Sequence, residues 1–303
     1  MNNKQFVIAD VFTEEQFGGN QLAVFVDGSG LDSATMQNIA REMNYSETTF
    51  LLPPEQGGDY RVRISTPAHE LPFAGHPIVG TAYVIVSERM KEWSEPLTSV
   101  TLETGMGLIH VEVQVEDGHA GRSTMTQPLP VVRGVYSNVA ALAKSLALEA
   151  SEIEGTGLPV ETVFNGIAVM IVPVKSRAAI ESIKVNGGAL ADISNEVGAS
   201  TVLVFAMDPV LPTSTVHCRV FAPAAGVGED AATGSANGPL GSYLVRHNLV
   251  ERLATTRIES EQGFEMKRPS LLYIDVDQTA GEVSAVRVGG GVVISGRGEI
   301  FVS

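Results

Sequence analysis

The sequence predicts an α+β protein made of two similar halves. Outside a few helical segments, most of the 303-residue sequence alternates between apolar and polar residues with a period of two, as in Asp59–Ser65 and Leu108–Val115, which is typical of half-buried strands. Only a few segments have helical periodicity, and strands do not alternate regularly with helices, so a parallel βαβ architecture is not expected. A set of short motifs in the first half also recurs, in the same order, in the second half.

Composition narrows the functional classes. The 20 Lys and Arg residues face 35 Asp and Glu residues, a formal net charge of −15, which argues against a nucleic-acid or anionic-membrane partner. No apolar run approaches the roughly 20 residues of a membrane helix, and the N-terminus has no secretory apolar segment. The single cysteine, Cys218, fits a reducing cytoplasm. We therefore expect a cytoplasmic protein with two domains, each with its own hydrophobic core.

Helices are expected where apolar residues recur every three or four positions. Met36, Ile39, Ala40 and Met43 follow a capping residue at Asp32 or Ser33 and predict the first helix. Pro77 in a first turn predicts a second helix from His76 to about Arg89. Three further helices are expected at Asn138–Leu148, Arg177–Ile183 and Ser235–His247. Strands are expected at Asp59–Ser65, Thr98–Thr104, Leu108–Val115 and Ser214–Phe221. Strands joined by tight turns are expected within Val283–Phe301, with breaks at Gly289–Gly291 and at Gly296.

Three pairs of segments make up the internal repeat. They are RISTP at Arg63–Pro67 with RVFAP at Arg219–Pro223, the Gly-rich helix starts Gly75–Tyr83 with Gly234–Tyr243, and NQLAV at Asn20–Val24 with NGIAV at Asn165–Val169. Chance could produce one such pair, but three in the same order favour two similar domains. The boundary between them is expected near residues 118–125.

The repeated Gly-rich loops suggest where a ligand could bind. If the two strand–loop–helix units faced each other, both helix N-termini would point into one cleft, near Gly75–His76 and Gly234–Ser235. Free N–H groups and the positive end of the helix dipole bind a carboxylate or phosphate without any Lys or Arg. The loops could instead serve only close packing of helix against sheet, and loop composition alone leaves both interpretations open.

Four polar residues near these loops favour a functional site. His76 and Ser235 lie at the two helix starts, Asp230 lies just before Ser235, and Glu47 follows the first helix at the opening of a strand. Any one of them alone is more often a cap or a solvated side chain. Four of them flanking two matched helix starts are better explained by chemistry than by capping.

Several longer motifs resemble the phenazine-biosynthesis PhzF-like family. They are SETTF at Ser46–Phe50, RISTP at Arg63–Pro67, ELPFAGHP at Glu70–Pro77, GEDAATGSA at Gly228–Ala236 and the closing VGGGVVISGRGEI at Val288–Ile300. The resemblance covers essentially the whole chain. It implies a diaminopimelate-epimerase-like fold of two pseudo-symmetric domains, each a β-barrel-like sheet around a central helix, with the active site between them. The C-terminal strand would return to the first domain, giving residues 1–122 with 290–303, and residues 123–289. Homodimers are common in the family.

The resemblance also implies an activity. It is that of a cofactor-independent isomerase that moves a proton within a small carboxylated substrate, of the dihydro-hydroxyanthranilate type. Glu47 would be the acid/base, with His76, Asp230 and Ser235 orienting the substrate and the helix starts at Gly75 and Gly234 holding its carboxylate. Related racemases use two cysteines, but the matching positions here are Gly75 and Ser235, so a two-thiol mechanism is disfavoured.

Other functional classes lack their motifs. The segment Gly226–Gly228 is not followed by the third glycine of a dinucleotide-binding loop, and there is no P-loop. The six histidines show no metal-ligand spacing, so neither a metal nor a cofactor is expected. The remaining alternative is a non-catalytic or differently specific relative that binds a small carboxylate and acts through protein partners. The presence of all four polar residues favours the enzyme.

Overall fold

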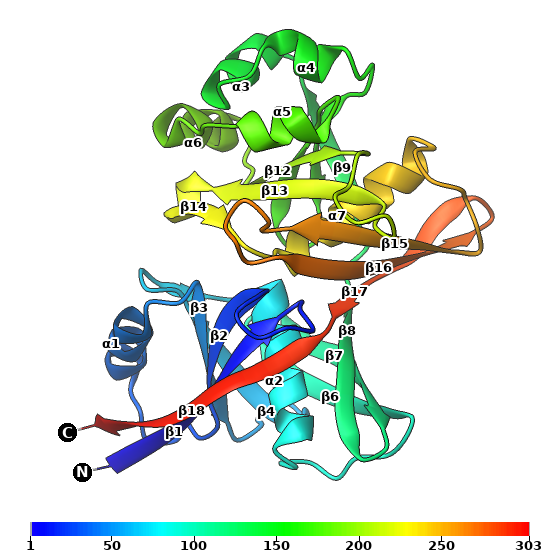
Figure 1. The fold of residues 1–303 in the computed structure, drawn as a ribbon. Helices are drawn as coiled ribbons and strands as arrows, with labels where there is room; N and C mark the ends of the chain where they lie inside the picture. Colours follow the sequence, from blue (N-terminus) through cyan, green and yellow to red (C-terminus); the bar gives the residue numbers. More distant parts are fainter. Residues whose placement is uncertain (1, 303) are drawn as a thin grey trace. The chain divides into compact units, whose positions relative to one another are not determined.

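A computed structural model describes residues 2–302, and strands and helices are mixed along the whole of that range. This confirms the predicted α+β class. By its internal contacts the chain divides into two compact units. The first unit comprises the residues up to Thr126 together with those from Gly289 on, and the second unit is Gln127–Val288. Each unit is built from strands that surround one buried helix (Figure 1).

The first unit is a series of paired strands. They are β1 (Asn2–Val11), β2 (Asn20–Phe25), β3 (Glu47–Leu52), β4 (Tyr60–Ser65), β5 (Glu70–Leu71), β6 (Leu97–Thr104), β7 (Gly107–Glu116), β8 (His119–Gln127) and β18 (Val292–Val302). The pairing order is β18–β1–β2–β3–β4–β6–β7–β8, with β5 added to the end of β4. Only β2–β3 and β4–β6 are parallel. The last strand of the chain therefore lies beside the first (Figure 1).

The buried helix of the first unit is α2 (Gly75–Ser87). Its sequence is apolar on nearly every side, so no face is suited to water, and its residues from Gly75 to Val86 are buried except for Tyr83. Gly80 permits the close approach of β1 and β2, because a Cβ atom there would lie 2.6 Å from Val11 Cγ2 and 2.7 Å from Leu22 Cδ2. By contrast, α1 (Ser33–Met43) buries only one face.

The second unit repeats this arrangement. Its strands are β9 (Val131–Tyr136), β10 (Val160–Phe164), β11 (Ala168–Pro173), β12 (Thr201–Ala206), β13 (Val216–Ala222), β14 (Val227–Asp230), β15 (Thr255–Gln262), β16 (Ser270–Thr279) and β17 (Glu282–Gly290). The order β9–β10–β11–β12–β13–β15–β16 again has two parallel pairs, β11–β12 and β13–β15, and β14 is added beside β13. The motif arginines match as well. Arg63 in β4 donates a hydrogen bond to Glu70 in the neighbouring strand β5, and Arg219 in β13 donates one to Glu229 in the neighbouring strand β14.

Helices complete the second unit. They are α3 (Val139–Ser145), α4 (Ala150–Glu154), α5 (Arg177–Ser182), α6 (Gly187–Glu196) and the buried α7 (Gly234–Arg246), with a short 3₁₀ turn at Pro223–Ala225. The first four lie together against the strands β11–β13 (Figure 1) and share one apolar core with them. In α7, a Cβ atom at Gly241 would lie 2.6 Å from the Ile274 side chain, so glycine again permits close packing of helix on strand.

The five helices predicted from periodicity are confirmed. Asp32 is the N-cap of α1 and accepts a hydrogen bond from Thr35 N, as its place before the apolar pattern suggested. Helices α2 and α7 begin one residue earlier than predicted, at Gly75 and Gly234. The break predicted at Gly296 is wrong, because β18 runs through that residue, which pairs with Ile8 of β1 beside a bulge. Helices α4 and α6 were not predicted. The first has only five residues, and the second opens with two glycines, which are poor helix formers.

The close packing of α2 yields a stability prediction. We expect Gly80→Ala to lower the free energy of unfolding by about 1–3 kcal/mol, because its Cβ must displace buried side chains of β1 and β2. Gly187→Ala, in the first turn of α6, is the control, since nothing lies within 4 Å of its Cβ. The midpoint of thermal unfolding measures both. Equal midpoints for the two variants would contradict this account of Gly80.

Candidate active site

Two of the four predicted site residues touch in the first unit. Glu47 opens β3 and pairs across the parallel β2–β3 ladder with Leu22. His76 is the second residue of α2. The Oε2 atom of Glu47 lies 3.3 Å from Nε2 of His76, and the two side chains are 13% and 4% exposed. Both side chains are therefore largely enclosed, and the Oε2 atom of Glu47 is itself buried.

His76 is neutral in this setting. Burial lowers the pKa of its ring to about 3, against a weaker opposing effect of the Gln21 carbonyl. The contact with Glu47 is thus between a carboxyl group and an uncharged ring, not an ion pair. A neutral ring has one N–H donor and one acceptor nitrogen. Nδ1 of His76 lies 3.2 Å from Nδ2 of Asn20, and the Asn20 Oδ1 accepts a 2.7 Å hydrogen bond from Ser46 Oγ.

The other two predicted residues lie on either side of the N-cap of α7 in the second unit. Asp230 ends β14, and its Oδ2 accepts a hydrogen bond of 2.5 Å from Thr233 Oγ1. Thr233 is the N-cap of α7, and Ser235 is the second residue of that helix, with 6% of its surface exposed. Ser235 thus occupies the same place in α7 as His76 does in α2.

The starts of the two buried helices differ from those of the other longer helices. The N-cap side chains of α1, α3, α5 and α6 each accept a hydrogen bond from their first turn. The N-caps of α2 and α7, Ala74 and Thr233, provide no such bond, which is also true of the five-residue α4. Because these caps leave the opening N–H groups to other partners, the starts at Gly75 and Gly234 suit an anion.

Sequence reasoning missed the residues that support these starts. Asn20 was noticed only as part of a repeat, and Ser46 only as part of a motif. Gln262 carried no signal, yet its amide donates to the Asp230 carbonyl at 2.8 Å and accepts from Thr233 N at 3.0 Å. The matched motifs NQLAV and NGIAV were the available clue, since Asn165 also reaches the helix start and donates to the Ser235 carbonyl at 3.0 Å.

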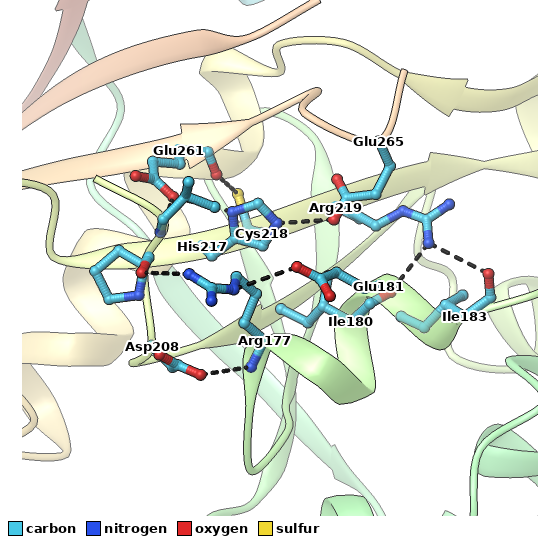
Figure 2. A network of polar contacts seen from close by, with 12 residues as sticks. Arg177, Ile180, Glu181, Ile183, Asp208, His217, Cys218, Arg219, Glu261 and Glu265 are labelled. Atoms are coloured by element: carbon cyan, nitrogen blue, oxygen red, sulfur yellow. Dashed lines mark hydrogen bonds and ion pairs between the residues drawn. The ribbon is translucent and has the colours of Figure 1, made fainter. Parts of the chain in front are cut away.

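A separate polar network lies within the second unit around His217 (Figure 2). The buried ring of His217 contacts Glu261 at 3.0 Å through Nδ1 and Glu265 at 2.9 Å through Nε2. Burial alone lowers the pKa of His217, but these two carboxylates outweigh it and raise it to about 9. The neighbouring Cys218 is fully buried, and burial raises the pKa of its thiol to about 12. A thiol in this state is structural rather than nucleophilic.

Within residues 2–302 no group of three or more His, Cys, Asp or Glu residues is arranged to hold a metal ion. Likewise, none of the helices described there is long and apolar enough to cross a membrane.

A carboxylate that touches a neutral imidazole can accept a proton and return it, which is the chemistry of isomerases that move a proton. The comparisons with known proteins agree. The family described as phenazine biosynthesis-like protein (PhzC-PhzF) matches residues 9–298. A trans-2,3-dihydro-3-hydroxyanthranilate isomerase of Pseudomonas aeruginosa is 36% identical over 308 residues, covering 98% of this chain and 99% of that protein. Its namesake from Pseudomonas chlororaphis is 37% identical over 297 residues, with the same coverage.

A solved structure supports the same assignment. The crystal structure of the Bacillus anthracis phenazine biosynthesis protein of the PhzF family is 26% identical, with a TM-score of 0.90 and full coverage of both chains. The chain therefore belongs to the PhzC-PhzF family of phenazine biosynthesis-like proteins. It is an isomerase of this family, which confirms the enzyme class expected from the sequence motifs.

The charged His217 predicts how stability depends on pH. The pKa of His217 is about 9 in the folded chain and near 6.5 in an unfolded one. Its stabilising effect is complete below pH 6.5 and disappears as the pH rises through 9. We expect the difference in unfolding free energy between wild type and His217→Gln to fall by ~3 kcal/mol between pH 6 and pH 9.5. Chemical denaturation at several pH values measures it. A difference that stayed constant would show that His217 does not change charge on unfolding.

Proposed function

We propose that this protein is a cofactor-independent isomerase that moves a proton from one carbon to another within a small carboxylated substrate, with Glu47 as the acid/base. The support is the contact between Glu47 Oε2 and His76 Nε2, at 3.3 Å, beside the uncapped start of the buried helix α2. Glu47 is the more exposed member of the pair, so we assign the contact with the substrate carbon to Glu47 rather than to His76.

The proposed reaction needs one proton and no redox step. The Glu47 carboxylate takes a proton from a substrate carbon, the double bond shifts along the substrate, and the same carboxyl group returns the proton to another carbon. The composition of the substrate is unchanged. His76 cannot supply a positive charge, because its pKa of about 3 keeps it neutral. Its proposed task is to hold the carboxylate or a substrate oxygen by hydrogen bonding.

The second unit contributes orientation in this proposal. Asp230 and Ser235 are assigned to the polar groups of the substrate, and the backbone N–H groups near Gly75–His76 and Gly234–Ser235 to its carboxylate. The absence of side-chain caps at both helix starts favours this assignment. The carboxylate would then be held without Lys or Arg.

The substrate class comes from the relatives. Because two relatives at 36% and 37% identity are named for trans-2,3-dihydro-3-hydroxyanthranilate, we propose a cyclic dihydro-hydroxyanthranilate-type acid as the substrate. We further propose a cytoplasmic homodimer that does not bind nucleic acid. The excess of 35 acidic over 20 basic residues supports the last point, and the buried, unpaired Cys218 suits a reducing compartment.

Replacing the acid/base tests the mechanism. We expect Glu47→Gln to keep the fold and the KM but to lower kcat by roughly 10²–10⁴, because an amide of the same shape cannot carry the proton. The assay follows deuterium incorporation from D₂O into trans-2,3-dihydro-3-hydroxyanthranilate. Glu112→Gln, an exposed position on β7, is the matched control and should react like wild type.

Two results would count against this assignment. Wild-type exchange by Glu47→Gln would remove Glu47 from the reaction. Tight binding of the acid by the wild-type protein, with no exchange at all, would favour a non-catalytic binding protein that acts through partners.

Asp230 allows a separate test of orientation. We expect Asp230→Asn to raise KM and lower kcat, by roughly 10- to 100-fold in kcat/KM, since a hydrogen bond to a charged group contributes about 1.5–3 kcal/mol. Ser235→Ala should show a smaller effect in the same direction. Steady-state kinetics and thermal unfolding are measured together, because the Thr233–Asp230 bond also shapes the loop. Unchanged kinetics in both variants would exclude these residues from the substrate site.

A further inference from the structure

We propose that Asn20 is a positioning residue that sets the tautomer of His76, keeping the ring hydrogen on Nε2, where it faces Glu47. The catalytic consequence rests on the function proposed above, but the tautomer itself can be measured without any substrate. Asn20 opens β2, and 56 residues separate it from His76 in the sequence.

A neutral, buried histidine needs a partner that decides which nitrogen is protonated. His76 is 4% exposed, so bulk water cannot make this choice. Its two ring nitrogens have different neighbours, Asn20 Nδ2 at 3.2 Å from Nδ1 and Glu47 Oε2 at 3.3 Å from Nε2. The hydrogen bond at one nitrogen determines the state of the other.

Ser46 orients the Asn20 amide. Its hydroxyl donates to Asn20 Oδ1 at 2.7 Å, which leaves the amide nitrogen of Asn20 facing His76. An amide nitrogen only donates, so Nδ1 accepts and the ring hydrogen belongs on Nε2. Four side chains are thus in contact in the order Ser46, Asn20, His76, Glu47. The first and the last of them are consecutive residues at the start of β3.

One other polar group lies near the ring. The main-chain carbonyl of Gln21 is an acceptor that favours the charged form of His76. Asn20 is the neighbour whose contact with Nδ1 is defined, at 3.2 Å. Replacing its amide by an acceptor or by an apolar side chain therefore removes the donor that keeps Nδ1 unprotonated.

The tautomer matters because of what Nε2 presents to Glu47. With hydrogen on Nε2, the ring has a donor on the side of the Glu47 carboxyl group, 3.3 Å away, although Nε2 itself makes no hydrogen bond to any residue that the structure describes. With hydrogen on Nδ1, the Nε2 lone pair faces the carboxylate oxygen and repels it. Only the first arrangement avoids this repulsion of the group that we propose as the acid/base.

Nitrogen-15 NMR of the histidine rings tests the tautomer directly. At pH 7.5 we expect His76 to be neutral with hydrogen on Nε2. Its signals are identified as those missing in His76→Gln. His217, with a pKa of about 9, serves as an internal standard for a charged ring. In Asn20→Asp we expect Nδ1 to become protonated, because a carboxylate only accepts, and in Asn20→Leu we expect a smaller fraction of rings with hydrogen on Nε2. Gln21→Ala keeps the carbonyl and the amide and should match wild type. A wild-type ring with hydrogen on Nδ1 would overturn the proposal.

Exchange kinetics separate this inference from the proposed function. We expect Asn20→Leu to lower kcat for deuterium exchange at least about tenfold with little change in KM, and Ser46→Ala to give an intermediate loss. A shifted tautomer with unchanged kcat would overturn the catalytic role of Asn20. The wild-type ring could carry its hydrogen on Nε2 while the protein exchanges no candidate substrate. That result would support the tautomer assignment and count only against the proposed function. Should Asn20→Asp fail to fold, the Leu and Ser46 variants still decide the question.

Discussion

Each unit of this protein encloses one helix on all sides, and the other features of the candidate site depend on that burial. Helices α2 and α7 are buried along almost their whole length, so the backbone groups at their starts cannot rely on water. Hydrogen-bonding groups left unpaired in such a place cost about 1–3 kcal/mol each. Polar side chains therefore gather there. Gln127 donates to the Gly234 carbonyl at 2.8 Å and Asn165 to that of Ser235 at 3.0 Å, while Asn20 reaches the second residue of α2.

The same burial explains why one histidine is neutral and another charged. His76 and His217 are both almost fully enclosed. His217 lies between Glu261 and Glu265, and the pKa of its ring is raised to about 9 because two carboxylates outweigh the loss of hydration. His76 has an amide at one nitrogen and a more exposed carboxyl group at the other, and its pKa falls to about 3 because desolvation dominates. The charged ring belongs to a polar network between strands and the loop at Glu265, and the neutral ring lies at a helix start beside the Glu47 carboxyl group.

The repeat makes the differences between the units informative. Both units have the same order of paired strands, and both have an asparagine near the start of the buried helix. At the second position of that helix, however, the first unit has His76 and the second has Ser235. An imidazole can lie against a carboxylate in either of two neutral tautomers, whereas a hydroxyl simply rotates to suit its partner. The imidazole, whose tautomer matters, is therefore found in the unit where the acidic residue Glu47 is in contact with it.

Local patterns in the sequence determined the elements. Period-two alternation located strands such as β4, β6 and β7, and Asp32 and Pro77 marked helix starts to within a residue. Because those signals act within one element, they can be read without knowing the rest of the fold. The helices α4 and α6 were missed because a five-residue helix and a Gly-Gly start carry too little local preference for a helix.

Motifs likewise pointed to Glu47 and His76, yet no pattern revealed that their side chains touch, that Asn20 lies against the ring, or that His76 is neutral. Only the tertiary structure decided these points, because contacts between distant segments and the protonation of a buried group depend on which neighbours the packing supplies and on how much water it removes.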